Sequence, residues 1–158
     1  MAKESHLPHK GPHFALTKTP KNEKIIAGFP GYGLVATIAT GFLIEHLQCE
    51  KIGKFYFTQP PATVAIHANK VVDPVGVYYN NKYNLIIIHS IANVTGFEYE
   101  AADLVVDVAK QLDAKELICI EGVGSMDVET RPFYYSTSKE AIERMQKIGV
   151  ASIGEGMI

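Results

Sequence analysis

Hydrophobic residues along the body of this chain cluster into short, nearly continuous runs. Such runs occur at residues 24–28, 85–90 and 116–120, and glycine or a polar residue ends or directly follows each of them. Runs of this length without a polar alternation are typical of strands that are buried on both faces of a sheet. We therefore expect three central strands at these positions.

Apolar residues at helical spacing follow the first two of these strands. They recur at 34, 35, 38, 39, 42, 43 and 47, and again at 97, 101, 104, 105, 108 and 112. Both patterns predict helices, and the wide apolar stripe of the first one predicts a well-buried helix. A third helix is expected to begin after Ser138, a suitable N-cap, and to end at Gly149, a residue type common just after helix ends.

The pattern changes to short β-branched and aromatic runs between residues 51 and 83. The runs 55–58, 63–67 and 75–79 are separated by brief turns, which favours antiparallel hairpins, and a further strand is expected at 132–137. The element order predicts an α/β fold. We expect a mainly parallel central sheet with helices on both faces and an antiparallel hairpin group at one side.

Composition narrows the class of protein. The chain has 158 residues, 47% hydrophobic and 20% charged, which suits one globular domain. Its 15 basic and 17 acidic residues give a net charge of −2, which disfavours a nucleic-acid partner held by a basic surface. No apolar run approaches the ~20 residues of a membrane helix. The two cysteines are too few for a disulfide scaffold and favour reduced thiols in the cytoplasm.

The first 23 residues differ from the rest, being rich in lysine, histidine and proline. We expect a flexible arm at 1–23 and a single α/β domain at 24–158. The histidines of the arm, His6, His9 and His13, have a spacing that suits no fixed face, so no metal site is predicted.

A glycine-rich turn between the first strand and the first helix is the strongest candidate for chemistry. It contains Gly28, Phe29, Pro30, Gly31 and Gly33, and the stretch 31–36 fits the dinucleotide pattern G-x-G-x-x-A. The next predicted strand, however, ends without the acidic residue that would bind a ribose. Two interpretations stay open: a ligand-binding turn, or a structural turn whose glycines permit close packing.

The carboxyl ends of the three central strands should meet at one edge of the sheet. Polar residues near these ends form a candidate cleft: His89, Asn93, Glu121 and Ser125. The sequence contains no serine-nucleophile, phosphate-loop or zinc-protease motif, so no catalytic residue is assigned.

The stretch 28–35, Gly-Phe-Pro-Gly-Tyr-Gly-Leu-Val, and the helix after it resemble the opening of the proteasome assembly chaperone 2 family. The segments 51–53, 59–61, 85–88, 121–123 and 131–132 are similar to later elements of that family, and Glu155-Gly156-Met157-Ile158 resembles its E-G-x-I segment. The resemblance covers about residues 24–158.

The resemblance implies an α/β fold like that of purine nucleoside phosphorylases, with no established catalysis and no cofactor. It also implies an archaeal-type, self-associating protein that assists the assembly of proteasome α subunits. Family chains continue beyond the E-G-x-I segment, so we expect this chain to be C-terminally incomplete. The alternative function is a small-ligand or nucleotide-binding enzyme, ATP-grasp-labelled or Rossmann-like, that uses the strand-end cleft.

Overall fold

The computed structural model describes residues 11–21, 24–58, 64–67, 69–124 and 131–154. The chain divides after Gly122 into two compact units. The first unit contains β1 (His13–Leu16), β2 (Lys24–Gly28), the 3-10 turn η1 (Tyr32–Leu34), α1 (Val35–His46), β3 (Glu50–Tyr56), β4 (Ala65–His67), β5 (Lys70–Val72), β6 (Val75–Asn80), β7 (Leu85–Ser90), α2 (Glu98–Gln111) and β8 (Glu116–Ile120). The second unit contains β9 (Phe133–Tyr134), α3 (Lys139–Lys147) and β10 (Ala151–Ser152).

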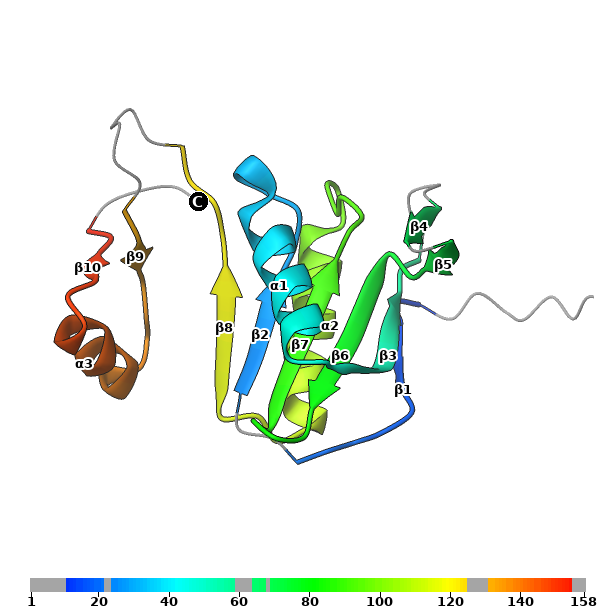
Figure 1. Ribbon diagram of the computed structural model, residues 1–158, viewed down its shortest axis with the longest axis horizontal. Helices are drawn as coiled ribbons and strands as arrows, with labels where there is room; N and C mark the ends of the chain where they lie inside the picture. Colours follow the sequence, from blue (N-terminus) through cyan, green and yellow to red (C-terminus); the bar gives the residue numbers. More distant parts are fainter. Residues whose placement is uncertain (1–10, 22–23, 59–63, 68, 125–130, 155–158) are drawn as a thin grey trace, which may run out of the picture. The chain divides into compact units, whose positions relative to one another are not determined.

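Six strands of the first unit form one mixed sheet in the order β1-β3-β6-β7-β2-β8 (Figure 1). β2 runs parallel to β7 and β8, whereas the pairs β1–β3, β3–β6 and β6–β7 are antiparallel. A mainly parallel sheet is therefore not confirmed, because three of the five strand pairs are antiparallel. In the pair β6–β7, a short turn joins the two strands directly. The expected hairpin group supplies β3 and β6 to the central sheet itself, and β4 and β5 form a separate two-stranded hairpin.

The long periodic segments form the predicted elements. β2, β7 and β8 occupy the expected runs, and all three helices begin and end within a few residues of their expected bounds. The Ser138 hydroxyl accepts a hydrogen bond from the Ala141 amide, as expected of an N-cap residue. Gly149 follows the C-terminus of α3 with a φ of 76°, the left-handed conformation in which glycine commonly ends a helix. The strand expected at 132–137 is shorter and is limited to Phe133–Tyr134.

Part of the expected N-terminal arm belongs to the sheet. His13–Leu16 form β1, which pairs with β3, and the His13 ring stacks on Tyr56 with ring centroids 4.6 Å apart. Residues 1–10 lie outside the described part of the chain. The apolar pattern does not predict this strand, because four residues carry too little alternation to be distinguished from a polar segment.

The two helices of the first unit lie on opposite faces of the sheet (Figure 1). α2 buries its apolar stripe against one face, where it forms the core with strand residues such as Ile25, Val77 and Ile86. α1 contacts β2, β7 and β8 on the other face. Only Ala36 and Thr40 of α1 are fully buried, so the expectation of a well-buried helix is wrong.

In the second unit, α3 connects two short parallel strands, β9 and β10. The Ile153 amide donates to the Tyr134 carbonyl just beyond the paired residues. An ion pair joins Arg144 and Glu140, one helical turn apart, at 3.9 Å. This unit is therefore a small β-α-β arrangement.

Candidate functional site

The carboxyl ends of β2, β7 and β8 lie at the same edge of the sheet, as their parallel register requires. Gly28 pairs with His89 on one side and with Ile120 on the other. The edge thereby gathers the glycine turn after β2, His89 at the end of β7, and Glu121 immediately after β8. Ser125, the fourth candidate for the cleft, lies outside the described residues.

The glycine turn seats α1 directly on the sheet. A Cβ atom on Gly28 would lie 2.7 Å from the Ala36 carbonyl oxygen and 2.6 Å from the Thr40 methyl group, so no other residue fits there without displacing the helix. Gly33 adopts a φ of 65°, in the left-handed region that favours glycine. Phe29 packs against the core, and Pro30 is half-buried. The turn thus has a structural role that accounts for Gly28 and Gly33.

Glu121 occupies the space beside Gly31. A side chain on Gly31 would collide with the Glu121 carboxylate, and the same carboxylate accepts a hydrogen bond from the Gly122 amide at 3.1 Å. In a dinucleotide site, the backbone at this turn approaches a pyrophosphate. In this chain the Glu121 carboxylate occupies the position beside Gly31 where a pyrophosphate would lie. Its negative charge would repel an anionic ligand.

His89 is tied to α1 through Thr40. The Thr40 hydroxyl donates to the Ala36 carbonyl at 2.7 Å, and His89 Nδ1 lies 2.9 Å from the same hydroxyl oxygen. Because that hydroxyl has one proton and gives it to Ala36, Nδ1 of the imidazole is the donor in the second bond. Burial lowers the pKa of His89, which favours the neutral ring. The arrangement therefore makes His89 a structural link between β7 and α1.

Asn93 is engaged within its own loop. Its side-chain oxygen accepts hydrogen bonds from the Thr95 amide at 2.9 Å and from the Thr95 hydroxyl at 2.6 Å. This is the local side-chain turn that asparagine commonly forms. The described members of the predicted cleft, His89, Asn93 and Glu121, therefore each have a hydrogen-bonded contact of their own.

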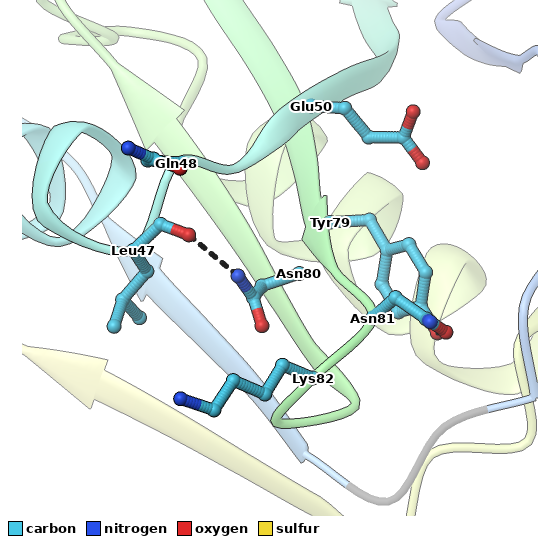
Figure 2. Close-up of a pocket in the computed structure, with 7 residues that line it drawn as sticks. All are labelled: Leu47, Gln48, Glu50, Tyr79, Asn80, Asn81 and Lys82. Carbon is cyan, nitrogen blue, oxygen red and sulfur yellow. Dashed lines mark hydrogen bonds between the residues drawn. The ribbon is translucent and has the colours of Figure 1, made fainter.

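A shallow pocket of about 500 Å³ lies at the opposite end of the sheet (Figure 2). The Asn80 amide donates to the Leu47 carbonyl at 2.6 Å, and the Asn80 side-chain oxygen accepts from the Tyr83 amide at 3.0 Å. Glu50 at its rim is paired with Lys18 at 2.7 Å. Tyr79, Asn80 and Glu50 in its lining are therefore engaged in contacts within the local structure. No motif in the sequence marks this pocket, and its only local signal is the polar stretch Asn80-Asn81-Lys82.

An exposed apolar surface runs along α1. We call this surface the outer face of α1, and we define it by Leu34, Val35, Ile38 and Phe42. Ile38 is 64% exposed and Phe42 is 62% exposed, and the Phe42 ring stacks on His46 with centroids 5.3 Å apart. The helical spacing predicted that these residues form a buried stripe, because the apolar pattern of a helix is the same whether or not another surface covers it.

A second exposed apolar surface lies on the β4–β5 hairpin. Ile66 and Val71 stand opposite each other in the antiparallel pair, and both are more than 70% exposed. Val64, two residues before Ile66, is equally exposed. Protein-binding sites are enriched in exposed apolar patches of this kind.

Within the described ranges, no three histidine, cysteine or acidic side chains gather closely enough to hold a metal ion. No helix in the same ranges has the length and apolar character needed to cross a membrane.

The fold resembles solved archaeal structures. A structure described as Pyrococcus furiosus PbaA, an archaeal homolog of proteasome-assembly chaperone, shares 25% sequence identity and a TM-score of 0.77. The match covers 93% of this chain and 65% of that one, so this chain spans about two thirds of its length.

Two other archaeal structures share the fold. P. furiosus PbaB, described as an archaeal proteasome activator, is 22% identical with a TM-score of 0.74, over 94% of this chain and 71% of PbaB. A Thermoplasma acidophilum protein described as of unknown function is 19% identical with a TM-score of 0.78, over 90% of this chain and 60% of that one.

Comparison with curated protein sequences finds no match. The model of the PAC2 family, in contrast, matches residues 25–158, which is nearly the whole body of the chain. This agrees with the resemblance carried by the glycine turn and by the segments after it. The chain belongs to the PAC2 family.

Proposed function

We propose that this chain is a proteasome-assembly-chaperone-like protein that binds proteasome α subunits through its surface, without catalysis. Membership of the PAC2 family and the likeness to P. furiosus PbaA support a role of this kind. The binding of α subunits goes beyond these findings and is the part that needs a test.

The single observation that carries the proposal is the contrast between the strand-end edge and the surface. At the edge, Glu121 fills the space beside Gly31, and Thr40 occupies one nitrogen of His89. On the surface, α1 and the β4–β5 hairpin expose large apolar side chains. Binding partners of protein size are recognised by such surfaces, whereas small ligands are held in concave sites with convergent polar groups.

We extend the proposal to three finer properties. We infer an archaeal-type protein that self-associates and works in the cytoplasm. Cys49 and Cys119 are both free, which is consistent with a reducing compartment. The likeness to purine nucleoside phosphorylases stays a prediction about the fold alone.

Immobilised chain and purified proteasome subunits provide the test. We expect the chain to retain archaeal-type α subunits and not the matched β subunits, and to increase the rate at which α subunits form rings. Retention of neither subunit, with a chain that remains folded by circular dichroism, would contradict the proposal. Equal retention of both subunits would contradict its specificity.

The alternative, a small-ligand or nucleotide-binding enzyme, has a separate test. A ligand that binds the native state must raise thermal stability. We expect no stabilisation by nucleotides, nucleosides or phosphate at saturating concentration. A clear upward shift of the melting temperature that disappears in the Gly33→Val variant would favour the alternative instead.

A further inference from the structure

The β4–β5 hairpin presents one face that is apolar throughout. Ile66 and Val71 are paired across the two strands, and Val64 lies two residues before Ile66, so the three side chains share a face. Ile66 is 71% exposed, and the two valines are each 74% exposed. We call this surface the outer face of the hairpin. A two-stranded hairpin is only marginally stable in water by itself, so an uncovered apolar face on one indicates a binding surface.

Contacts with the rest of the unit hold the hairpin so that this face points away from the body. The Pro74 carbonyl, two residues after β5, accepts a hydrogen bond from the Ile91 amide at 3.0 Å. Nε2 of His67 lies 3.7 Å from the Glu45 carboxylate of α1. Because adjacent residues of a strand point to opposite faces, the contact of His67 with α1 leaves Ile66 on the far side. The hairpin lies just beyond the start of β6 (Figure 1).

Lysines flank the outer face of the hairpin at its foot and near its tip. At the foot, Lys51 and Lys54 of β3 both pair with Asp73, the residue directly after β5, and the Lys54 contact is 3.0 Å long. One carboxylate thus serves two ammonium groups, and one positive charge is left over. Lys70 pairs with His67 at the other end of the hairpin and is exposed.

The sign of this charge differs from that of the opposite helix. Residues 51–97 contain four lysines and one acidic residue, a net charge of +3, whereas residues 98–113, which include α2, contain five acidic residues and one lysine, a net charge of −4. The outer face of α1 indicates no charge for a partner, because no charged residue lies between Lys24 and Glu45. An acidic partner is therefore attracted to the hairpin and repelled by α2.

We propose that the outer face of the hairpin docks a partner protein whose contact area has an apolar centre and an acidic rim, and that this partner is the proteasome α subunit. Protein interfaces commonly have a centre that excludes water and a polar rim. The hairpin supplies the centre, and Lys51, Lys54 and Lys70 supply a basic rim that favours an acidic one. This inference rests on the proposed function and identifies the element that makes the contact.

Truncation of the apolar centre is the first test. Biolayer interferometry with immobilised archaeal-type α subunits measures the dissociation constant of the full chain. We expect Ile66→Ser to raise that constant at least about tenfold, because the apolar centre carries most of the binding energy of an interface. The matched control is Val106→Ser, which changes an exposed apolar residue of α2 and should bind like the wild type. Circular dichroism and thermal melting establish that each variant is folded.

Charge reversal at the rim is the second test. Lys70→Glu should slow association and reduce its dependence on salt between about 50 mM and about 500 mM, whereas Lys70→Arg should behave like the wild type. The control is Lys110→Glu on α2, where the lysine side chain is 75% exposed. Both reversals change the net charge equally, so a loss limited to Lys70→Glu locates the acidic rim of the partner at the hairpin.

Hydrogen exchange of the bound chain locates the contact directly. We expect the amides of β4 and β5 to exchange more slowly in the complex with α subunits than in the free chain, because the docked partner excludes water from the hairpin. Slower exchange that is confined to α1 would assign the contact to the outer face of α1 and would overturn this inference.

The other outcomes separate this inference from the proposed function. Retention of α subunits that neither Ile66→Ser nor Lys70→Glu weakens would overturn the inference and leave the proposed function in place. No retention by the folded wild type would contradict the proposed function, and this inference with it. Self-association in sedimentation velocity that is lost in Ile66→Ser would assign the outer face of the hairpin to a second copy and would overturn the inference.

Discussion

The two helices that cover the central sheet differ in what they present to the outside. α2 buries Leu104, Val105 and Val108 in the core and turns Asp103 and Asp107 outward. α1 buries only Ala36 and Thr40, both small, and exposes Ile38 and Phe42. The apolar side chains of α2 thus stabilise the fold of the single chain, whereas Ile38 and Phe42 of α1 contribute little to it.

This contrast separates stability from interaction. A large apolar residue that contributes to a core is costly to remove, because its removal leaves a cavity. A large apolar residue on the outside has no such role in the single chain and is expected where a partner binds. The fully buried side chains of α1, Ala36 and Thr40, are instead small ones that lie next to Gly28.

The largest expected effect follows from truncating one residue on each helix. Leu104→Ala should lower the free energy of unfolding by about 2–5 kcal/mol, because Leu104 is 4% exposed in the core. Ile38→Ala should change it by less than about 0.5 kcal/mol in the monomer, since its side chain is mostly in water. Urea denaturation at submicromolar concentration measures both. Equal losses for the two variants would contradict the distinction between the helices.

The second effect concerns how α1 is seated. Gly28→Ala should cost about 1–3 kcal/mol, because the new methyl group would press on the backbone of α1 at Ala36. The control is Gly31→Ala, whose methyl group would first meet the movable end of the Glu121 side chain. Denaturation midpoints should therefore fall much further for Gly28→Ala. The reverse order would show that the turn, rather than the seat of the helix, limits stability.

The third effect tests the polar contact beneath α1. Thr40→Val keeps the shape of the side chain but removes the acceptor for His89 Nδ1, which we expect to cost about 1–2 kcal/mol. Thr40→Ser keeps the hydroxyl and should retain that bond. Equal stability of the valine variant and the wild type would mean that this bond contributes nothing to the attachment of α1.

Much of this arrangement could be predicted from the sequence. The sequence predicted β2, β7, β8 and the three helices, because the apolar pattern within each of these segments is long enough to indicate its secondary structure. β1, β5 and β10 were missed, since strands of two to four residues form only when a neighbouring strand offers hydrogen bonds. The mixed sheet was also missed, because the position of β6 between β3 and β7 depends on pairing between distant segments.

For the candidate site too, local patterns were predictable from the sequence and contacts between distant residues were not. The glycine turn and the strand-end residues were found from local signals, and the parallel register does place Gly28 beside His89. The approach of Glu121 to Gly31 joins residues about ninety positions apart, which no local motif encodes. The outer face of α1 was misjudged for a related reason: an apolar stripe shows that a surface avoids water, and it does not show which chain covers it.

The smallest expected effect is a dependence of stability on pH, centred on the inner side of α1. Burial lowers the pKa of His89 below its ordinary value of about 6.5. The unfolded chain therefore takes up a proton at this residue at a higher pH than the folded chain, so unfolding consumes a proton and acid favours it. The contribution is present above pH ~6.5 and is lost progressively as the pH falls below that value.

Denaturation from about pH 8 to about pH 5 should therefore show a loss of stability in the wild type that is reduced in His89→Gln, which has no group titrating in that range. Carboxylates that titrate lower in the range affect both proteins equally and cancel in the difference. Parallel curves for the two proteins would mean that His89 has the same pKa in both states, and hence that α1 does not bury it. Because this effect arises from the inner face of α1, an Ile38→Lys variant, which changes only the exposed face of the helix, should retain it in full.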